Sequence, residues 1–257
     1  FNVEDVLQLL ITSFVDGVAM KQVCGSIALI GASPSGQIQL MPFAQQIYNR
    51  LYEIFNEDVS NIDGTYLFRY LWCLRILLEK DLIDLQSVGN LSNPLTDIIC
   101  TSNVKNQLLA IHILKLTPEY ACQSLAKIKS AVFSPLSSEV VSSIASLVDI
   151  CATTNLDILQ GFINDLISTT IGLINDHQNS PNDDISQNIA SIVGVVAGNH
   201  EAIRLDILQG FEKTIVDKTN ISELPFLINC IGEIGALIDL SDHVDMINCI
   251  FELVNHP

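Results

Sequence analysis

The segment of the chain that comes closest to a catalytic motif is the glycine-rich stretch Gly31-Ala32-Ser33-Pro34-Ser35-Gly36. A phosphate-binding loop places a lysine directly after its second glycine, where it reaches the β- and γ-phosphates, and the loop follows a β-strand. Here Gln37 takes the place of that lysine, and no strand pattern precedes the stretch. A nucleophile elbow would need a glycine at the position of Ser35. We therefore interpret the stretch as a loop between two helices.

The histidines and cysteines do not follow the spacing of a metal site. Zinc binding needs three or four ligands that converge on one point. The chain has no Cys-x-x-Cys pair, and its five histidines are far apart without an i, i+4 pair: His112, His177, His200, His243 and His256. His243 and Cys249 are six residues apart, a spacing that points them to different faces of a helix. We expect no metal and no other cofactor, and we expect His112 to be a half-buried helix residue with one hydrogen-bond partner.

The acidic residues are numerous but dispersed along the chain. Acid–base catalysis requires two carboxyl groups held in a cleft with separated pKa values, and the sequence shows no such pair. Asp183-Asp184 stands where a predicted helix begins, so helix capping or stabilisation by the helix dipole is the simpler interpretation. Trp72 lies in an apolar stretch, and we expect it in the core rather than in a binding surface. The sequence therefore predicts no enzyme activity and no small-molecule substrate.

The composition favours helices packed on helices. Hydrophobic residues make up 49% of the 257 residues, and aromatic residues only 6%. The net charge of −17 argues against nucleic acid and anionic membranes as partners, because both attract clustered Lys and Arg. A basic protein partner is compatible with this charge, and so is a simple role of the acids in solubility. The longest apolar stretches, such as residues 189–198, fall short of the roughly 20 residues of a membrane span.

The start of the chain and its cysteines bear on its cellular context. The chain begins with Phe1-Asn2-Val3-Glu4, which is neither an initiator methionine nor a signal peptide, so we expect it to begin inside a longer protein. Seven cysteines are widely spaced in apolar stretches: Cys24, Cys73, Cys100, Cys122, Cys151, Cys230 and Cys249. This usage indicates free thiols that serve as small core residues in a reducing compartment.

The chain contains an internal repeat. The segment Leu156-Asp157-Ile158-Leu159-Gln160-Gly161-Phe162 recurs 49 residues later as Leu205-Asp206-Ile207-Leu208-Gln209-Gly210-Phe211. Upstream, Ile144-Ala145-Ser146 recurs 45 residues later as Ile189-Ala190-Ser191. A short insertion near residues 200–203 accounts for the difference between the two offsets. HEAT and armadillo repeats are helical units of about 40–47 residues, so the spacing is typical of a HEAT repeat with a slightly long loop.

Each copy has the periodicity of an amphipathic helix. The apolar stripe comprises Leu156, Leu159, Ile163 and Leu166 in the first copy and Leu205, Leu208 and Ile215, with Phe211 beside them, in the second. Gly161 and Gly210 occupy the same place in both copies. Because a glycine inside a helix costs about 1 kcal/mol relative to alanine, we expect a neighbouring helix to approach closely at both glycines.

Helical patterns cover most of the chain, and no strand pattern extends over a useful length. The predicted helices are 3–14, 17–31, 40–56, 65–80, 93–100, 103–116, 120–132, 136–153, 155–172, 185–198, 200–217, 221–238 and 241–254. Breaks are predicted at residues 33–36, 56–64, 89–94, 117–118 and 176–184, where turn-forming residues cluster. We predict an all-α fold, an α-solenoid of HEAT-type helix pairs with a right-handed superhelix. Residues 1–257 would form one continuous segment of about six helix pairs, without a polar cap at either end.

Several segments also resemble a known family. Asn229-Cys230-Ile231-Gly232-Glu233-Ile234-Gly235, followed by Ile238-Asp239-Leu240-Ser241, resembles a helix end and the start of the next helix in the cullin-associated, neddylation-dissociated proteins. Three further segments are similar to that family in the same order: Gln123-Ser124-Leu125-Ala126-Lys127-Ile128, Ser134-Pro135-Leu136 and Ser186-Gln187-Asn188-Ile189-Ala190. The resemblance covers about residues 65–257 and is strongest from residue 185 onward.

The resemblance implies a function. It implies a long HEAT solenoid that wraps a cullin bound to its RING subunit, prefers cullin without the ubiquitin-like modifier, and competes with the substrate-receptor adaptor. Such a protein would exchange substrate receptors on cullin–RING ubiquitin ligases in the cytoplasm and nucleus. This chain would be an internal part of the C-terminal half in a divergent lineage. A different HEAT-repeat adaptor, such as a nuclear transport receptor, is the alternative, and an all-helical enzyme is a third hypothesis.

The predicted partner contacts come from the solenoid interpretation. The inner wall of a solenoid binds its partner through many weak contacts. The polar faces of the predicted helices 200–217 and 241–254 would line that wall. We therefore predict partner contacts at Glu212, Lys213, Asn248 and Glu252, with a solvated surface as the alternative.

Overall fold

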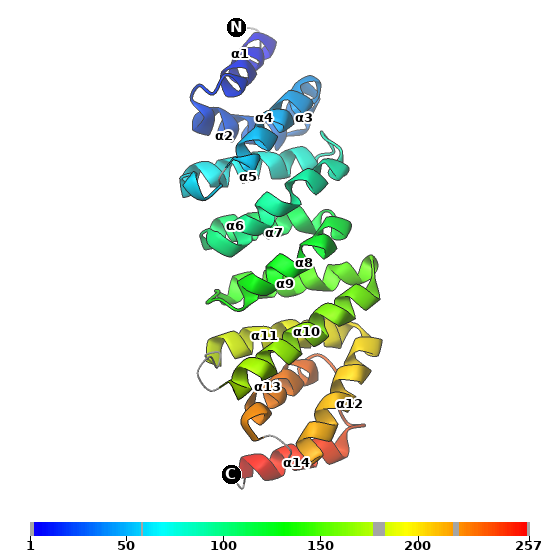
Figure 1. The fold of residues 1–257 in the computed structure, drawn as a ribbon. Coiled ribbons are helices and arrows are strands. Elements are labelled where there is room, and N and C mark those ends of the chain that lie inside the picture. Colours follow the sequence, from blue (N-terminus) through cyan, green and yellow to red (C-terminus); the bar gives the residue numbers. More distant parts are fainter. Residues whose placement is uncertain (1–2, 58, 177–182, 218–220, 256–257) are drawn as a thin grey trace. The chain divides into compact units, whose positions relative to one another are not determined.

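The computed structural model describes residues 3–57, 59–176, 183–217 and 221–255. Within these ranges every regular element is an α-helix or a short 3-10 helix, so the all-α prediction is confirmed. The helices form two compact units, residues 1–128 and residues 129–257, and the boundary lies inside α8 (Pro118–Val132). Figure 1 shows the order of the helices along the chain. Across the described ranges, no helix combines the length and the apolar character needed to cross a membrane.

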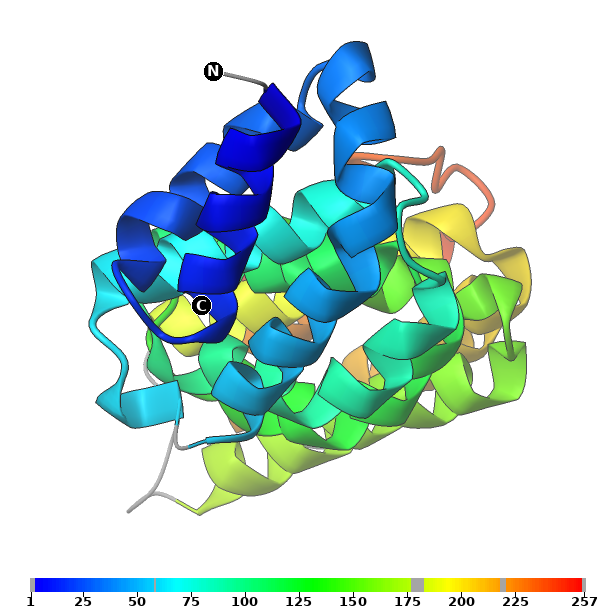
Figure 2. The same ribbon diagram turned by 90° about the horizontal axis from the view of Figure 1, so that it is seen from above.

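In the first unit, three helices that are not consecutive in sequence follow one another in space. α5 (Gly64–Glu79) packs against both α2 (Met20–Gly31) and α7 (Val104–Lys115). α1 (Val3–Val15), the darkest blue helix in Figure 2, packs against α2 and α4 (Ala44–Asn56). The remaining elements of this unit are α3 (Pro34–Leu40), α6 (Ser92–Thr101) and the 3-10 helices η1 (Met41–Phe43), η2 (Val59–Asn61) and η3 (Leu85–Leu91).

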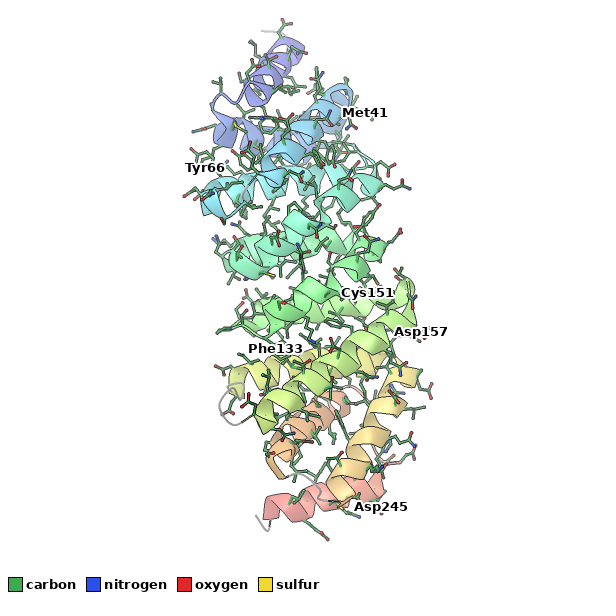
Figure 3. The ribbon with its side chains drawn as sticks, viewed as in Figure 1. Met41, Tyr66, Phe133, Cys151, Asp157 and Asp245 are labelled. Carbon is green, nitrogen blue, oxygen red and sulfur yellow. The ribbon has the colours of Figure 1, made fainter. Side chains whose placement is uncertain are left out.

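The second unit repeats this alternation. α11 (Asp183–Asn199) packs against α9 (Ser138–Ile150) on one side and α13 (Leu224–Gly235) on the other. Between them in sequence lie α10 (Leu156–Asn175) and α12 (Glu201–Asp217), with the 3-10 helices η4 (Cys151–Thr153) and η5 (Ile221–Glu223), and α14 (Val244–Asn255) follows α13. α10 and α12 both contact α11, and α12 also contacts α13 and α14. Figure 3 shows side chains between these helices, including the fully buried Cys151 at the end of α9.

The twin segments lie in corresponding helices of the second unit. The first copy starts at the first residue of α10, whereas the second starts at the fifth residue of α12. The insertion predicted near residues 200–203 is therefore one additional helical turn at the start of α12. The upstream pair Ile144 and Ile189 are both fully buried, in α9 and α11. The apolar stripe was wrong at its first position, because Leu156 and Leu205 are exposed in the first turns of the two copies.

The glycine-rich stretch lies between two helices, but the loop predicted at residues 33–36 is wrong from Pro34 onward, because the second helix, α3, begins there. The Ser33 hydroxyl caps α3 by accepting a hydrogen bond from the Gly36 backbone N–H at 3.1 Å. Pro34 takes the first helical position, where its missing N–H costs nothing. A Cβ atom at Gly36 would collide with the carbonyl of Ile30, so packing explains this glycine. The break predicted at 89–94 was also misplaced, because α6 begins at Ser92.

The expected close approach at Gly161 and Gly210 is wrong. Both glycines are exposed, and a Cβ atom built on either would have no neighbour within 4 Å. The close approach is at Gly194 in α11, where a Cβ atom would run into the backbone and Cβ of Glu233 in α13. A glycine at the same place in two repeat copies does not by itself show that another helix approaches it, because tertiary packing determines which helices approach.

Other single-residue expectations had mixed outcomes. All seven cysteines are free, but Cys100 is exposed and Cys249 is half-buried, so only the other five are core residues. Trp72 is half-buried rather than in the core. Asp183 and Asp184 lie in the first turn of α11, where the helix dipole favours carboxylates, as predicted. His177 and His256 lie outside the described residues.

His112 is a half-buried helix residue, as predicted. Its Nε2 lies 2.5 Å from Oε1 of Glu79 on the neighbouring α5. The same carboxylate oxygen accepts a hydrogen bond from Arg75 Nε at 2.8 Å. Partial burial acts to raise the pKa of the Glu79 carboxyl, but the bonds from Arg75 and His112 outweigh it, so this pKa lies below its usual value. This polar contact links α5 to α7 within the first unit.

Candidate functional site

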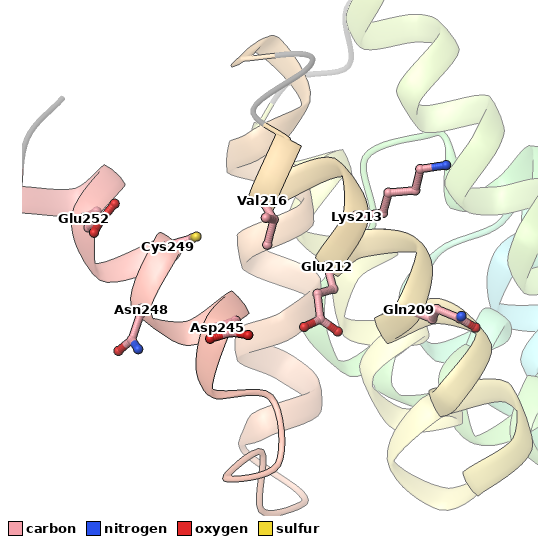
Figure 4. A pocket seen from close by; sticks show the side chains of 8 residues that line it. All are labelled: Gln209, Glu212, Lys213, Val216, Asp245, Asn248, Cys249 and Glu252. Carbon is pink, nitrogen blue, oxygen red and sulfur yellow. The ribbon is translucent and has the colours of Figure 1, made fainter.

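The predicted partner contacts line one hollow of the second unit, which we call the α12/α14 groove. It has a volume of about 550 Å³. From α12 it is lined by Gln209, Glu212, Lys213 and Val216, and from α14 by Asp245, Asn248, Cys249 and Glu252 (Figure 4). The structure therefore brings together Glu212, Lys213, Asn248 and Glu252, the four residues named from the sequence.

The groove is built from two matching helix faces. On each helix the lining residues fall at positions i, i+3, i+4 and i+7, which lie on one face over two turns. On α12 these positions start at Gln209, and on α14 they start at Asp245. The groove is therefore the space between two helical stripes, and its length is set by the two turns that each helix contributes.

Buried side chains on the other faces hold the two helices in place. In α12, Leu208, Phe211 and Ile215 are buried and alternate with the groove residues. In α14, Met246 is completely buried, next to the groove residue Asp245. Burial of a large apolar side chain contributes about 1.5–3 kcal/mol to stability, so these residues hold α12 and α14 in the positions from which the groove residues project.

The turn before α14 sets the start of the second stripe. The Asp239 carboxylate accepts a hydrogen bond from the Ser241 backbone N–H at 2.9 Å, which is an Asx turn. The chain then turns once more, because the His243 N–H donates to the Leu240 carbonyl at 2.9 Å. As a result α14 begins at Val244, three residues after the predicted start at residue 241.

Carboxylates dominate the charge of the groove. Three of the lining residues carry carboxylates, namely Glu212, Asp245 and Glu252, and only Lys213 carries a positive charge. In Figure 4 the Lys213 side chain extends away from α14, whereas the Glu212 carboxylate lies on the side of α12 that faces it. His243 Nδ1, just before α14, lies 3.6 Å from Glu212 Oε2. The groove therefore has an acidic character that Lys213 does not offset from within.

The charge of the whole second unit has the same sign. Residues 129–257 contain seventeen acidic and four basic residues, a net charge of −13, and residues 1–128 contain twelve and eight, a net charge of −4. Most of the excess negative charge of the chain thus lies in the unit that contains the groove. Such a field attracts basic partners and raises their association rate.

Apolar surface is also present in the groove. Val216 is 44% exposed, and in Figure 4 the thiol of the half-buried Cys249 points toward α12. An apolar surface beside carboxylates suits lysine and arginine, because their aliphatic stems pack on it while the charged head reaches the acids.

The sequence missed four of the groove residues: Gln209, Val216, Asp245 and Cys249. A helical wheel drawn through the predicted contacts would have found them, since they complete the two stripes.

Among the described residues, no group of three or more His, Cys, Asp or Glu side chains is arranged to hold a metal ion. No protein-family model matches the chain, and no curated protein matches it.

Proposed function

We propose that the chain is a non-catalytic scaffold of HEAT-type helix pairs that binds another protein. In this proposal residues 1–257 form one continuous right-handed solenoid of about six helix pairs. The observation that carries it is the internal repeat, whose two copies occupy corresponding places in α10 and α12. The packing of α11 between α9 and α13, and of α5 between α2 and α7, is what neighbouring repeats require of each other.

The partner we propose is an unmodified cullin bound to its RING subunit. The chain would regulate the exchange of substrate-receptor adaptors on cullin–RING ubiquitin ligases, in the cytoplasm and nucleus. Support comes from the resemblance described above. Its strongest segment includes the end of α13 at Gly235 and continues to Ser241. The resemblance puts the start of the next helix at Asp239-Leu240-Ser241, whereas these residues form a turn and α14 begins at Val244.

Affinity capture with purified components tests this function. The immobilised chain is offered a cullin–RING complex with and without its ubiquitin-like modifier, at equal concentrations. We expect clearly stronger capture of the unmodified complex, and release of the adaptor when the chain is added to an assembled ligase. Equal capture of the two forms, or capture of neither, would contradict the proposal.

A nuclear transport receptor built from the same type of repeats is the second candidate. The observation that favours it is the net charge of −13 in the second unit, which suits a basic targeting peptide. Binding of a Ran-type GTPase in its GTP form separates this candidate from the first, because a cullin exchange factor has no requirement for it. GTPase binding together with the absence of cullin binding would favour the transport receptor.

A further inference from the structure

We propose that the α12/α14 groove binds a basic amphipathic helix of a partner protein. This inference rests on the proposed function in one respect, namely that the partner is a protein. It adds which surface makes the contact and which chemistry the surface recognises. The occupant presents lysine or arginine side chains to the groove together with a stripe of apolar side chains.

The shape of the groove fits a helix. Two helical stripes of equal length, starting at Gln209 and Asp245, form its walls. A partner helix recognised in a groove inserts side chains at i, i+3, i+4 and i+7, the same spacing that the walls have. The volume of about 550 Å³ accommodates several side chains from such a helix.

The charge of the groove selects a basic occupant. A lysine or arginine that lies along the groove packs its stem on Val216 and Cys249. Its charged head then reaches the carboxylates of Glu212 and Asp245, where charge-assisted hydrogen bonds can form. An acidic helix in the same place would meet three carboxylates and one lysine, so electrostatic repulsion disfavours it.

The groove is specific to the second repeat copy. In α10, the positions that correspond to Glu212 and Val216 are Ile163 and Ile167, and both are buried. The same face of the repeat is thus covered in one copy and open in the next. The open face is that of α12, which has the carboxylate of Glu212 at its centre, and this agrees with a surface that recognises charge.

The test uses a synthetic peptide of about 18 residues, or five helical turns, labelled for fluorescence anisotropy. It carries leucine on one face and lysine or arginine on the other. One control peptide has the same composition in an order without amphipathic periodicity, and a second has glutamate in place of every basic residue. We expect the basic amphipathic peptide to bind at least about tenfold more tightly than either control, and its affinity to fall between about 50 and 500 mM salt. Equal binding of the amphipathic and reordered peptides would overturn the proposal.

Two double variants locate the binding on the surface. Glu212→Gln with Asp245→Asn removes two carboxylates from the groove. Asp157→Asn with Glu201→Gln removes two carboxylates from the first turns of α10 and α12, outside the groove. Both change the net charge by the same amount. We expect the groove variant to bind the basic peptide about tenfold more weakly and the control variant to stay within about twofold of the unaltered chain. If both variants lost the same affinity for the peptide, overall charge alone would attract it. If the groove variant lost no affinity, the peptide would bind elsewhere on the chain. Either result overturns the proposal.

The capture experiment with cullin–RING complex separates this inference from the proposed function. A chain that binds the peptide through Glu212 and Asp245 but captures no cullin–RING complex refutes the proposed function and leaves the groove assigned. A chain that captures the unmodified complex but not the basic peptide supports the proposed function and refutes the groove assignment.

Discussion

α10 and α12 contain the same seven-residue segment, yet they present different surfaces to their surroundings. Leu159 and Leu208 are the fourth residues of the two copies, and both are almost completely buried. The phenylalanines that end the copies, Phe162 and Phe211, are buried to a similar degree. The shared segment thus fixes how each helix packs on its unit, and the differences arise from the residues around it.

The first difference follows the segment directly. Ile163 in α10 is fully buried, whereas the corresponding Glu212 in α12 has a side chain that is 35% exposed. One turn later Ile167 is buried and Val216 is 44% exposed. The face that is covered in the first copy is therefore open in the second, where it forms one wall of the groove. Two positions on a repeat are enough to change its surface without changing its anchors.

The second difference precedes the segment. In the first copy Asn155 caps α10, and its side-chain oxygen accepts hydrogen bonds from the N–H groups of Asp157 and Ile158 at 3.0 and 3.2 Å. The corresponding residue in the second copy is Arg204, which lies inside α12 because that helix starts one turn earlier. Arg204 instead donates hydrogen bonds to the carbonyls of Ala197 and Gly198 at the end of α11.

The largest expected effect on stability comes from replacing Ile163, which lies at the centre of the covered face of α10. Ile163→Glu places a carboxylate at a fully buried position, so we expect the free energy of unfolding to fall by about 3 kcal/mol or more at pH 7. Burial raises the pKa of the new carboxyl in the folded state, so the folded state binds the proton more tightly than the unfolded state. The deficit should therefore shrink as the pH falls toward about 4. Urea unfolding followed by circular dichroism at both pH values measures this.

Ile163→Val is the matched control, because it keeps the site apolar and should cost only about 0.5–1.5 kcal/mol. If Ile163→Glu lowered the free energy of unfolding by less than Ile163→Val does, α10 and α12 would not differ at this face.

The glycines of the two copies give the next largest contrast. Gly194→Ala should lower the free energy of unfolding by about 1–3 kcal/mol, because the new methyl group would meet the backbone of Glu233 in α13. Gly161→Ala and Gly210→Ala have open space around the new methyl group, so each should raise the free energy of unfolding by about 0.5–1 kcal/mol. Thermal unfolding of the three variants decides the matter. A destabilised Gly161→Ala variant would mean that a neighbouring helix does approach α10 there.

Removal of the cap that only the first copy has should cost about 1 kcal/mol. Asn155→Ala leaves the N–H groups of Asp157 and Ile158 without their side-chain acceptor. Asn155→Asp, which keeps an acceptor and adds a charge that the helix dipole favours, should stay close to the unaltered chain. Chemical denaturation of the pair measures the cap. Equal stability of the alanine and aspartate variants would contradict the assigned role of Asn155.

These contrasts show which features of the fold the sequence could predict. Apolar periodicity at helical spacing predicted most helices to within a few residues, because this pattern depends on local geometry that the sequence contains. α3 is not among the predicted helices, since the cluster of Gly, Pro and Ser at residues 33–36 predicts a loop, although proline at a first helical position is favourable. The neighbour of Gly194 could not be predicted, because it depends on the distance between α11 and α13, which tertiary packing sets.

The candidate site was predicted only in part for the same reason. Glu212 and Lys213 were named because they lie on the polar face of one predicted helix, and Asn248 and Glu252 because they lie on that of another. Sequence periodicity places residues on a face, but it does not show that the two faces line the same groove. Asp245 was missed although it precedes Asn248 by three residues within the predicted helix 241–254, a spacing that places both residues on one face.

The smallest effect on stability is expected for a substitution in the groove that also weakens binding of the peptide. Glu212→Ile gives α12 the residue that α10 has at this position, and the side chain there is 35% exposed. Its stability should therefore change by no more than about 0.5 kcal/mol, as for other surface positions. The variant loses a central carboxylate of the groove, so the basic amphipathic peptide should bind several-fold more weakly. Denaturation and fluorescence anisotropy on the same protein preparation separate the two quantities. Glu212→Gln, which removes the charge but keeps the size, should weaken the peptide to a similar extent. If isoleucine weakened binding and glutamine did not, the shape of the residue and not its charge would control the open face, and α12 would differ from α10 in packing alone.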